Sequence, residues 1–276
     1  MAGDTMVTSE FGDASAAGAA PLFSIRDAQV VRSERTILQV DSFDLAEGEH
    51  VALLGPNGAG KSTFIQLLTR ETFPLYREEP PVRFRGQGRP LLEDIHRALG
   101  IVSSTMHEQV RVHLPVADIV CGGLFGTLGV PRHVHPSPAD RAAAADALER
   151  LGIADLADRD IMTLSTGQAR RALVARELVR DPQVLIFDEP CTGLDPQGMY
   201  QLRQTMAQLA AEGRSIVLVT HYPEDIIPAI DRVLLIKDAH VFADGPKAEL
   251  LTTPTMRELF DVPLTVASHD GWYALY

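Results

Sequence analysis

The chain has 276 residues and a formal net charge of −12, with 45% hydrophobic and 22% charged residues. This composition is typical of a globular protein with an ample core, and the acidity argues against nucleic-acid binding, which needs a basic surface. The two cysteines, Cys121 and Cys191, lack the spacing of a metal site or a CxxC motif. They favour reduced, buried thiols and a cytoplasmic protein over a disulfide.

Residues 1–22 are mostly small, polar or acidic and show no periodicity, which predicts a flexible tail. The first basic residue is Arg26, so we expect no secretory signal peptide. No apolar run approaches the ~18 residues that span a bilayer. If the protein works at a membrane, another chain is expected to supply the crossing.

From Phe23 onward the pattern alternates between strands and helices. Short apolar runs rich in β-branched residues predict buried parallel strands, and Asp195 and Gly213 bracket a predicted helix. The strands are expected at 23–31, 36–45, 47–55, 183–189, 215–221 and 232–238. Residues of about 100–165 are predicted to form a mostly helical insert. The fold class is therefore α/β with a largely parallel sheet.

Residues 55–63 read GPNGAGKST and follow the apolar run VALL. Glycines permit the backbone conformations that aim successive N–H groups at an anion, and a helix starting near Gly60 adds its positive end. Lys61 would reach the β- and γ-phosphates, and the Ser62 hydroxyl would bind Mg²⁺. The pattern G-x-x-x-x-G-K-[ST] predicts a nucleotide phosphate site. Its residues are Gly55, Pro56, Asn57, Gly58, Ala59, Gly60, Lys61, Ser62 and Thr63.

Polar residues elsewhere extend this prediction. Asp188 and Glu189 end an apolar strand, where parallel sheets place their ligand chemistry. Asp188 is expected to hold Mg²⁺, directly or through water, and Glu189 to polarise an attacking water. Ser165 and Gln168 form an S-x-x-Q capping box at a helix start, which can also hold a phosphate. His221 ends the strand SIVLVTH, where a γ-phosphate contact is expected.

Together these motifs resemble those of the ATP-binding-cassette (ABC) ATPases. GPNGAGKST is similar to their Walker A motif, LSTGQ to the signature, VLIFDEP to Walker B with the catalytic glutamate, GLD to the D-loop and THYPED to the H-loop. The resemblance runs from about Phe23 to beyond Phe260. It implies an ATPase using ATP and Mg²⁺, with one domain over residues 23–276. That domain would be a P-loop NTPase with a RecA-like parallel core, an N-terminal antiparallel β-subdomain and the helical insert.

The resemblance also implies partners. In this family two cassettes pair head to tail around two ATP molecules, so Ser165, Gly167 and Gln168 would contact nucleotide across the interface. Asp195 would couple the two sites, Glu189 would be the general base and His221 the γ-phosphate sensor. One cassette per chain implies a homodimer or a partner cassette. Separate transmembrane subunits would dock through the helical insert at the inner face of the cell membrane, and the cargo would not bind this chain.

Three positions depart from the family pattern. Ser104 stands where the Q-loop glutamine is expected; it could reach Mg²⁺ through water, but it is too short to link the γ-phosphate to the insert. Arg32 lies nearest the place of the aromatic residue that stacks on adenine, and its guanidinium could stack instead. Thr166 replaces the first signature glycine. None of these changes removes a hydrolytic group.

Two functional hypotheses remain. The leading one is the ATP-hydrolysing subunit of a membrane transporter, because the chain lacks the second cassette, the long coiled coils and the zinc insertions typical of soluble ABC ATPases. GIVSS and the following DIVCGGLFGTLG are similar to bacterial molybdenum- or iron-type transport ATPases. The alternative is a soluble ABC ATPase acting on a protein or ribonucleoprotein complex, which the altered Q-loop position favours. A P-loop kinase is disfavoured by LSTGQ together with GLD. Cargo and direction of transport stay open.

Overall fold

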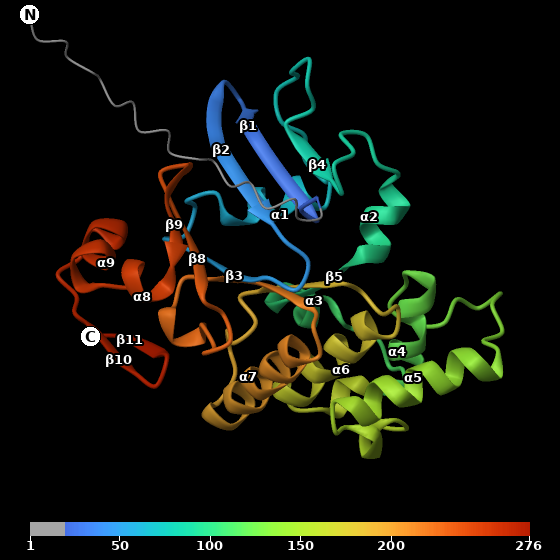
Figure 1. The fold of residues 1–276 in the computed structure, drawn as a ribbon. Helices are drawn as coiled ribbons and strands as arrows, with labels where there is room; N and C mark the ends of the chain where they lie inside the picture. The colour runs from blue at the N-terminus through green and yellow to red at the C-terminus, as the bar shows by residue number, and fades with distance from the viewer. Residues whose placement is uncertain (1–19) are drawn as a thin grey trace, which may run out of the picture.

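The computed structural model describes residues 20–276, except for the side chains of residues 107–109. A 9-stranded sheet, ordered β4-β1-β2-β9-β8-β3-β7-β6-β5, runs through the molecule (Figure 1). Its strands are β1 (Phe23–Arg32), β2 (Arg35–Leu45), β3 (His50–Leu54), β4 (Val82–Phe84), β5 (Leu99–Ser103), β6 (Val184–Asp188), β7 (Ser215–Thr220), β8 (Arg232–Lys237) and β9 (His240–Pro246). Strands β8, β3, β7, β6 and β5 are parallel, whereas β1 pairs antiparallel with β2 and β4. The predicted α/β class is confirmed.

Helices cover both faces of the parallel part of the sheet. They are α1 (Lys61–Leu68), α2 (Leu92–Ala98), α3 (Ser104–Gln109), α4 (Val116–Gly122), α5 (Pro138–Arg150), α6 (Thr166–Leu178), α7 (Pro196–Ala211), α8 (Lys247–Leu250) and α9 (Thr253–Phe260). Alternate residues of β3 point to opposite faces. Val51 and Leu53 join the buried cluster that contains α1, and Ala52 and Leu54 join the cluster that contains α6 and α7. Burial on both faces explains the continuous apolar strands.

Local signals in the sequence define the helix ends, and for α7 they are the predicted ones. Asp195 caps α7 by accepting a hydrogen bond from the backbone N–H of Gly198 at 2.7 Å, and Pro196 is the first helical residue. Gly213 follows the helix with a positive φ of 87°. The Ala-rich helix α5 begins at a capping box on Ser137. These side chains satisfy N–H groups that a helix start leaves without partners.

The structure locates the start of the helical insert and the end of the N-terminal tail more exactly than the sequence did. Strand β5 pairs with β6 in the main sheet, so the helical segment begins at Ser104 rather than near residue 100. The predicted tail, 1–22, lies mostly outside the described residues. Within them, Leu22 is buried and donates its backbone N–H to the carbonyl of Leu45 at 2.8 Å. The folded part therefore includes Leu22.

The segment after α9 packs against the core cluster that contains α6 and α7. Beyond α9 the chain forms a hairpin of β10 (Val266–His269) and β11 (Trp272–Leu275), whose ends are antiparallel partners. Figure 1 shows this hairpin beyond α8 and α9, at the side of the molecule opposite the insert helices α4 and α5. Among the helices of residues 20–276, none combines the length and apolarity needed to cross a membrane.

Candidate nucleotide site

The C-terminal ends of four neighbouring parallel strands meet at one edge of the sheet. Leu54 of β3 lies opposite Thr220 of β7, and Asp188 of β6 lies opposite both Val219 of β7 and Ser103 of β5. The phosphate-loop sequence, the predicted histidine and the predicted glutamate leave β3, β7 and β6 from these ends. Open α/β sheets bind their ligands at this edge.

The loop after β3 has a shape that only glycine permits. A Cβ on Gly55 would lie 2.0 Å from the carbonyl oxygen of Ile236 in β8, so any side chain there would clash with backbone. Gly58 and Gly60 have positive φ angles of 79° and 116°, which L-residues rarely adopt. Gly60 is the N-cap of α1, and the helix begins at Lys61 as predicted. The N–H groups at this helix start can bind an anion.

Lys61 is buried beneath this loop. Its Nζ donates hydrogen bonds to the carbonyl oxygens of Gly55 at 2.7 Å and Pro56 at 3.0 Å. Burial lowers the pKa of Lys61, while the charges of Glu189 and Asp188 act to raise it. The ammonium therefore lies between the phosphate loop and the acidic end of β6.

Glu189 is held in an unusual backbone conformation. Its φ is 48°, in the left-handed region, which costs a non-glycine residue on the order of 1–3 kcal/mol. Its backbone N–H donates to the carbonyl of Val219 at 2.8 Å, which ties the residue to β7. The side-chain Oε1 lies 3.0 Å from Nδ1 of His221. Because a carboxylate only accepts, the imidazole N–H donates in this bond.

Asp188 is a carboxylate without a hydrogen-bond partner among residues 20–276. Burial raises its pKa, the charge of Glu189 raises it further and Lys61 lowers it. The hydroxyl of Ser62 is exposed at the first turn of α1, with no side-chain partner in the same part of the chain. Hydroxyl and carboxylate oxygens are the ligands that Mg²⁺ prefers, and a cation would relieve the repulsion at Asp188. The donor set therefore fits Mg²⁺.

A second kind of metal site, built from His, Cys, Asp and Glu side chains alone, has no support in the described residues. Within the described residues, no three His, Cys, Asp or Glu side chains lie close enough to hold an ion by themselves. The two cysteines are buried and free, as predicted.

The predicted signature and D-loop residues gather at a separate cleft of about 480 Å³ between the starts of α6 and α7. Ser165 and Gln168 form the predicted capping box at the start of α6, through hydrogen bonds of 3.3 and 3.0 Å. A Cβ on Gly167 would lie 3.2 Å from Cα of Gly198, so the two helix starts pack closely. Asp195 lines the same cleft.

Two of the three altered positions, Arg32 and Ser104, have few contacts with the rest of the site. Arg32 is exposed at the end of the β1–β2 hairpin and has no side-chain partner among the described residues. Ser104 is the first residue of α3, beyond the end of β5. Ser103, which the sequence did not single out, accepts from the N–H of Met106 at 3.1 Å and lies opposite Asp188. The sequence carried no signal for this position of Ser103, because it depends on the register of β5 against β6.

Sequence reasoning also missed a buried polar group behind the site. Asp225 contacts Thr220 and Arg203, and Arg170 donates from α6 to the carbonyl of Pro190 at 3.0 Å, directly after Glu189. Charged residues such as Asp225 and Arg170 are expected at the surface when only the sequence is known. Burial could have been suspected only from the apolar residues that follow Asp225.

A P-loop that leaves a parallel strand beside a carboxylate and a histidine defines a nucleotide-hydrolysing cassette. The ABC transporter family model matches residues 38–192. The chain is 33% identical to the uncharacterized ABC transporter ATP-binding protein YlmA of Bacillus subtilis (strain 168), over 89% of this chain and 93% of that protein. It is 32% identical to the hemin import ATP-binding protein HmuV of Thermobifida fusca (strain YX), over 85% and 80%.

Solved structures agree. CbiO1 from Clostridium perfringens, part of the ABC transporter complex cbiONQ, has a TM-score of 0.72 and 26% identity, covering 87% of this chain and 94% of its own. An ATP-binding cassette of an ABC transporter in its ADP conformation has a TM-score of 0.74, 21% identity and coverage of 87% and 98%, and shows the fold alone. The chain belongs to the ABC transporter family, as one of its ATP-binding, ATP-hydrolysing proteins.

Proposed function

We propose that this chain hydrolyses Mg-ATP at the sheet edge, with Glu189 as the general base. The observation that carries the proposal is the 3.0 Å hydrogen bond between Glu189 and His221, which joins the ends of two strands next to the phosphate loop. Glu189 would accept the proton of the attacking water, and His221 would orient that carboxylate and sense the γ-phosphate. The strained backbone of Glu189 supports the assignment, because such strain concentrates at functional sites.

The nucleotide would be held by the nine residues of the phosphate loop. Lys61 would contact the β- and γ-phosphates, while Ser62 and Asp188 would hold Mg²⁺, with Ser104 acting through water. The cation would supply charge neutralisation on the phosphate oxygens. Arg32 would stack its guanidinium on the adenine. Its exposure leaves it accessible for such a contact.

Two copies of the chain, or this chain and a partner cassette, would close around two nucleotides. The hydrogen bonds of Ser165, Gln168 and Asp195 remain within their own helix starts. Their cleft is therefore a pre-formed surface for the nucleotide of an opposing chain. Closure on ATP and opening after hydrolysis would drive separate membrane subunits, since ATP contacts differ between the two states.

Replacing Glu189 with Gln tests the hydrolytic role. The variant removes the base but keeps the shape, so we expect turnover to fall about 10²–10⁴-fold while ATP still binds. Steady-state phosphate release and equilibrium ATP binding measure the two effects. Unchanged turnover would exclude Glu189 as the base.

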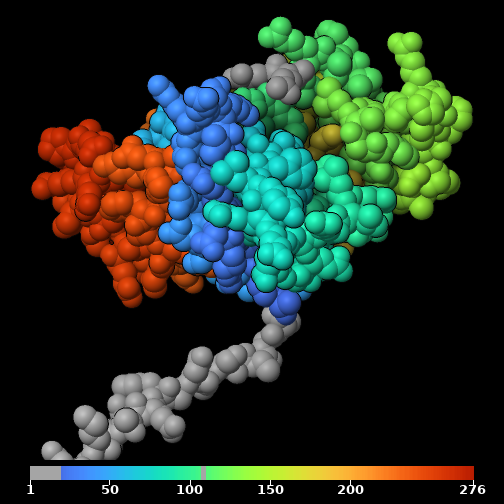
Figure 2. Space-filling model, turned by 90° about the horizontal axis from the view of Figure 1, so that it is seen from above, coloured from blue at the N-terminus to red at the C-terminus, as the bar shows by residue number. Residues whose placement is uncertain are grey.

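An exposed apolar pocket supports docking of a membrane partner. The segment between α1 and α2 lies on the outside of the molecule beside β1 and β2 (Figure 2), and it encloses a pocket of about 490 Å³. Phe73 is 68% exposed and Tyr76 85% exposed. Exposed apolar surface of this kind marks interaction sites.

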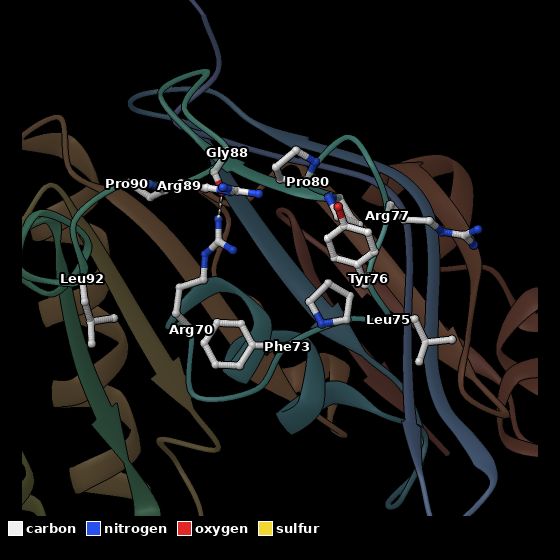
Figure 3. A pocket seen from close by; sticks show the side chains of 12 residues that line it. Arg70, Phe73, Leu75, Tyr76, Arg77, Pro80, Gly88, Arg89, Pro90 and Leu92 are labelled. Atoms are coloured by element: carbon white, nitrogen blue, oxygen red, sulfur yellow. Dashed lines mark hydrogen bonds between the residues drawn. The ribbon is translucent and has the colours of Figure 1, made fainter.

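The charge of this pocket indicates what it would bind. Arg70, Arg77 and Arg89 line it, and no Asp or Glu does (Figure 3). In the described part of the chain, Arg70 donates to the carbonyls of Val82 and Gly88, at 2.7 and 3.4 Å, and to no carboxylate. In a chain of net charge −12, this cationic, apolar surface suits an acidic, amphipathic cytoplasmic segment of a membrane-spanning subunit.

Charge-reversal variants distinguish docking at this pocket from docking at the helical insert, which the sequence predicted. Arg89→Glu tests the pocket and Arg132→Glu an exposed loop of the insert. We expect the first to reduce co-purification with a multi-spanning chain from host membranes about tenfold, without changing the ATPase rate of the isolated cassette. If Arg132→Glu alone reduces it, docking uses the insert. Recovery with soluble proteins only would favour the alternative of a cytosolic ABC ATPase.

A further inference from the structure

A buried carboxylate lies directly behind the loop that carries His221. The side chain of Asp225 is 6% exposed. Its Oδ1 accepts a hydrogen bond from Nη2 of Arg203 in α7 at 3.0 Å, and its Oδ2 accepts one from the hydroxyl of Thr220 at 2.9 Å. Burial of a carboxylate is costly unless it is paired, and Asp225 is paired on both oxygens.

Thr220, which donates to Asp225, connects the backbone on the two sides of His221. Thr220 precedes the histidine, and its Oγ1 accepts from the backbone N–H of Tyr222 at 3.0 Å while donating to Asp225. The ring of His221 lies 3.9 Å from that of Tyr222 between centroids. The orientation of the histidine therefore depends on a turn that the carboxylate closes.

The same carboxylate faces the loop that follows Glu189. Cys191, two residues beyond the proposed base, is buried against Asp225 and Arg203. Burial and the charge of Asp225 raise the pKa of this thiol to about 12. It stays neutral and packs as an apolar group. The loop that carries Glu189 and the loop that carries His221 therefore both pack against the Asp225–Arg203 ion pair.

The C-terminal hairpin covers that ion pair. The guanidinium carbon of Arg203 lies 5.5 Å from the centre of the Trp272 ring. In the same hairpin, the backbone N–H of Leu275 donates to Oε1 of Glu224 at 2.8 Å, next to Asp225. An aromatic face over a guanidinium holds it in place and excludes water, which strengthens the pairing.

We propose that Asp225 and Arg203 are positioning residues that hold His221 against Glu189, and that Trp272 of the C-terminal hairpin locks Arg203 in this arrangement. The proposal rests on the hydrolytic roles given above to Glu189 and His221. The C-terminal hairpin, which is far from the phosphate loop in sequence, would thus help to set the geometry of the Glu189–His221 pair. Neither Asp225 nor Arg203 would touch the nucleotide.

The test is Asp225→Asn, with Glu177→Gln as a matched control. Glu177 is equally buried, at 5% exposure, and pairs with Arg176 in α6 and with Arg180 just beyond the end of that helix. We expect Asp225→Asn to lower kcat at least tenfold with KM within twofold, in folded protein shown by its melting curve. Glu177→Gln should lose stability without this selective loss of kcat. Equal losses in both variants, or an unchanged kcat in Asp225→Asn, would overturn the proposal.

A second pair of variants tests the hairpin. Trp272→Ala should lower kcat about three- to tenfold at unchanged KM, and Trp272→Phe, which keeps an aromatic face, should restore most of it. Failure of the phenylalanine to restore activity would remove Trp272 from the proposal. The Glu189→Gln measurement is independent: if it abolishes turnover and Asp225→Asn does not, the positioning role alone fails.

Discussion

The nucleotide edge and the signature cleft are built in opposite ways. At the edge, groups from different strands contact one another: Glu189 bonds to His221, and Lys61 lies between the loop carbonyls and the acidic strand end. At the cleft, within residues 20–276, the side chain of Ser165 forms hydrogen bonds only at the start of α6, and that of Asp195 only at the start of α7. The first region is a converging set of side chains, and the second is a surface of helix starts.

This difference indicates which chain of a pair would hydrolyse a given nucleotide and which would only bind its phosphate. A converging set could perform chemistry on a nucleotide held at the same edge, because the proposed base and the proposed cation-binding groups would already be together. Capped helix starts offer N–H groups and a favourable dipole but no base. They suit recognition of a phosphate that another chain presents. The predictions below test this contrast, from the largest expected effect to the smallest.

Lys61→Ala should weaken ATP binding about 100-fold, which corresponds to roughly 2.8 kcal/mol. The buried ammonium would provide charge-assisted hydrogen bonds to phosphate that no other loop residue would replace. Binding of a fluorescent ATP analogue measures the loss.

Lys247 provides the control for this prediction. Its Nζ donates to the carbonyls of Ile227 and Pro228 at 3.3 and 2.8 Å, and burial lowers its pKa too. Lys247→Ala should reduce stability and leave ATP affinity within twofold. Equal weakening by both variants would show that burial of a lysine, rather than its place in the loop, matters.

Ser165→Ala should lower turnover about tenfold while the isolated chain binds ATP as before, since the serine would act on the nucleotide of the opposing chain. Ser137→Ala is the matched variant, because Ser137 forms the same capping box at the start of α5. Each variant should lose about 1 kcal/mol of helix stability. If both slow ATP turnover alike, Ser165 acts only as a cap; phosphate-release assays and melting curves decide.

Asp188→Asn should raise the melting temperature of the nucleotide-free protein at pH 7–8 by about 2–4 °C, the shift that about 1 kcal/mol produces in a domain of this size. Burial and Glu189 raise the native pKa of Asp188, so the protonated form contributes stability below the ordinary pKa of about 3.9. That contribution is lost as pH rises through the native pKa.

The gain from Asp188→Asn should therefore shrink as pH falls toward about 4. Melting curves across this range, without Mg²⁺ or nucleotide, measure it. A lower melting temperature in the variant at pH 7 would show that Asp188 already has a stabilising partner in the protein alone.

Much of the fold followed from local patterns in the sequence. Apolar runs predicted β6, β7 and β8, and the capping residues Asp195 and Ser165 lie at the helix starts where they were expected. These features depend on neighbours within about four residues along the chain, so the sequence carries their signal. The phosphate loop is the strongest case, because glycine spacing, lysine and flanking elements agree.

The contacts behind the site could not be predicted in this way. Asp225, Arg203 and Trp272 come from a turn, a helix and the C-terminal hairpin, and their meeting depends on packing across the whole domain. Sequence periodicity assigns Arg203 to a helix but does not say which carboxylate it pairs with. The position of Ser103 opposite Asp188 could not be predicted for a similar reason, since it required the register of β5 against β6.

The most direct test of the contrast between the two regions is ATP-dependent association of the Glu189→Gln chain, followed by light scattering. If the cleft serves an opposing nucleotide, this variant should double its mass when ATP is added. The double variant Glu189→Gln, Ser165→Arg should bind ATP equally well but remain monomeric. ATP-driven pairing that survives the arginine, or its absence in Glu189→Gln alone at saturating ATP, would contradict a shared site.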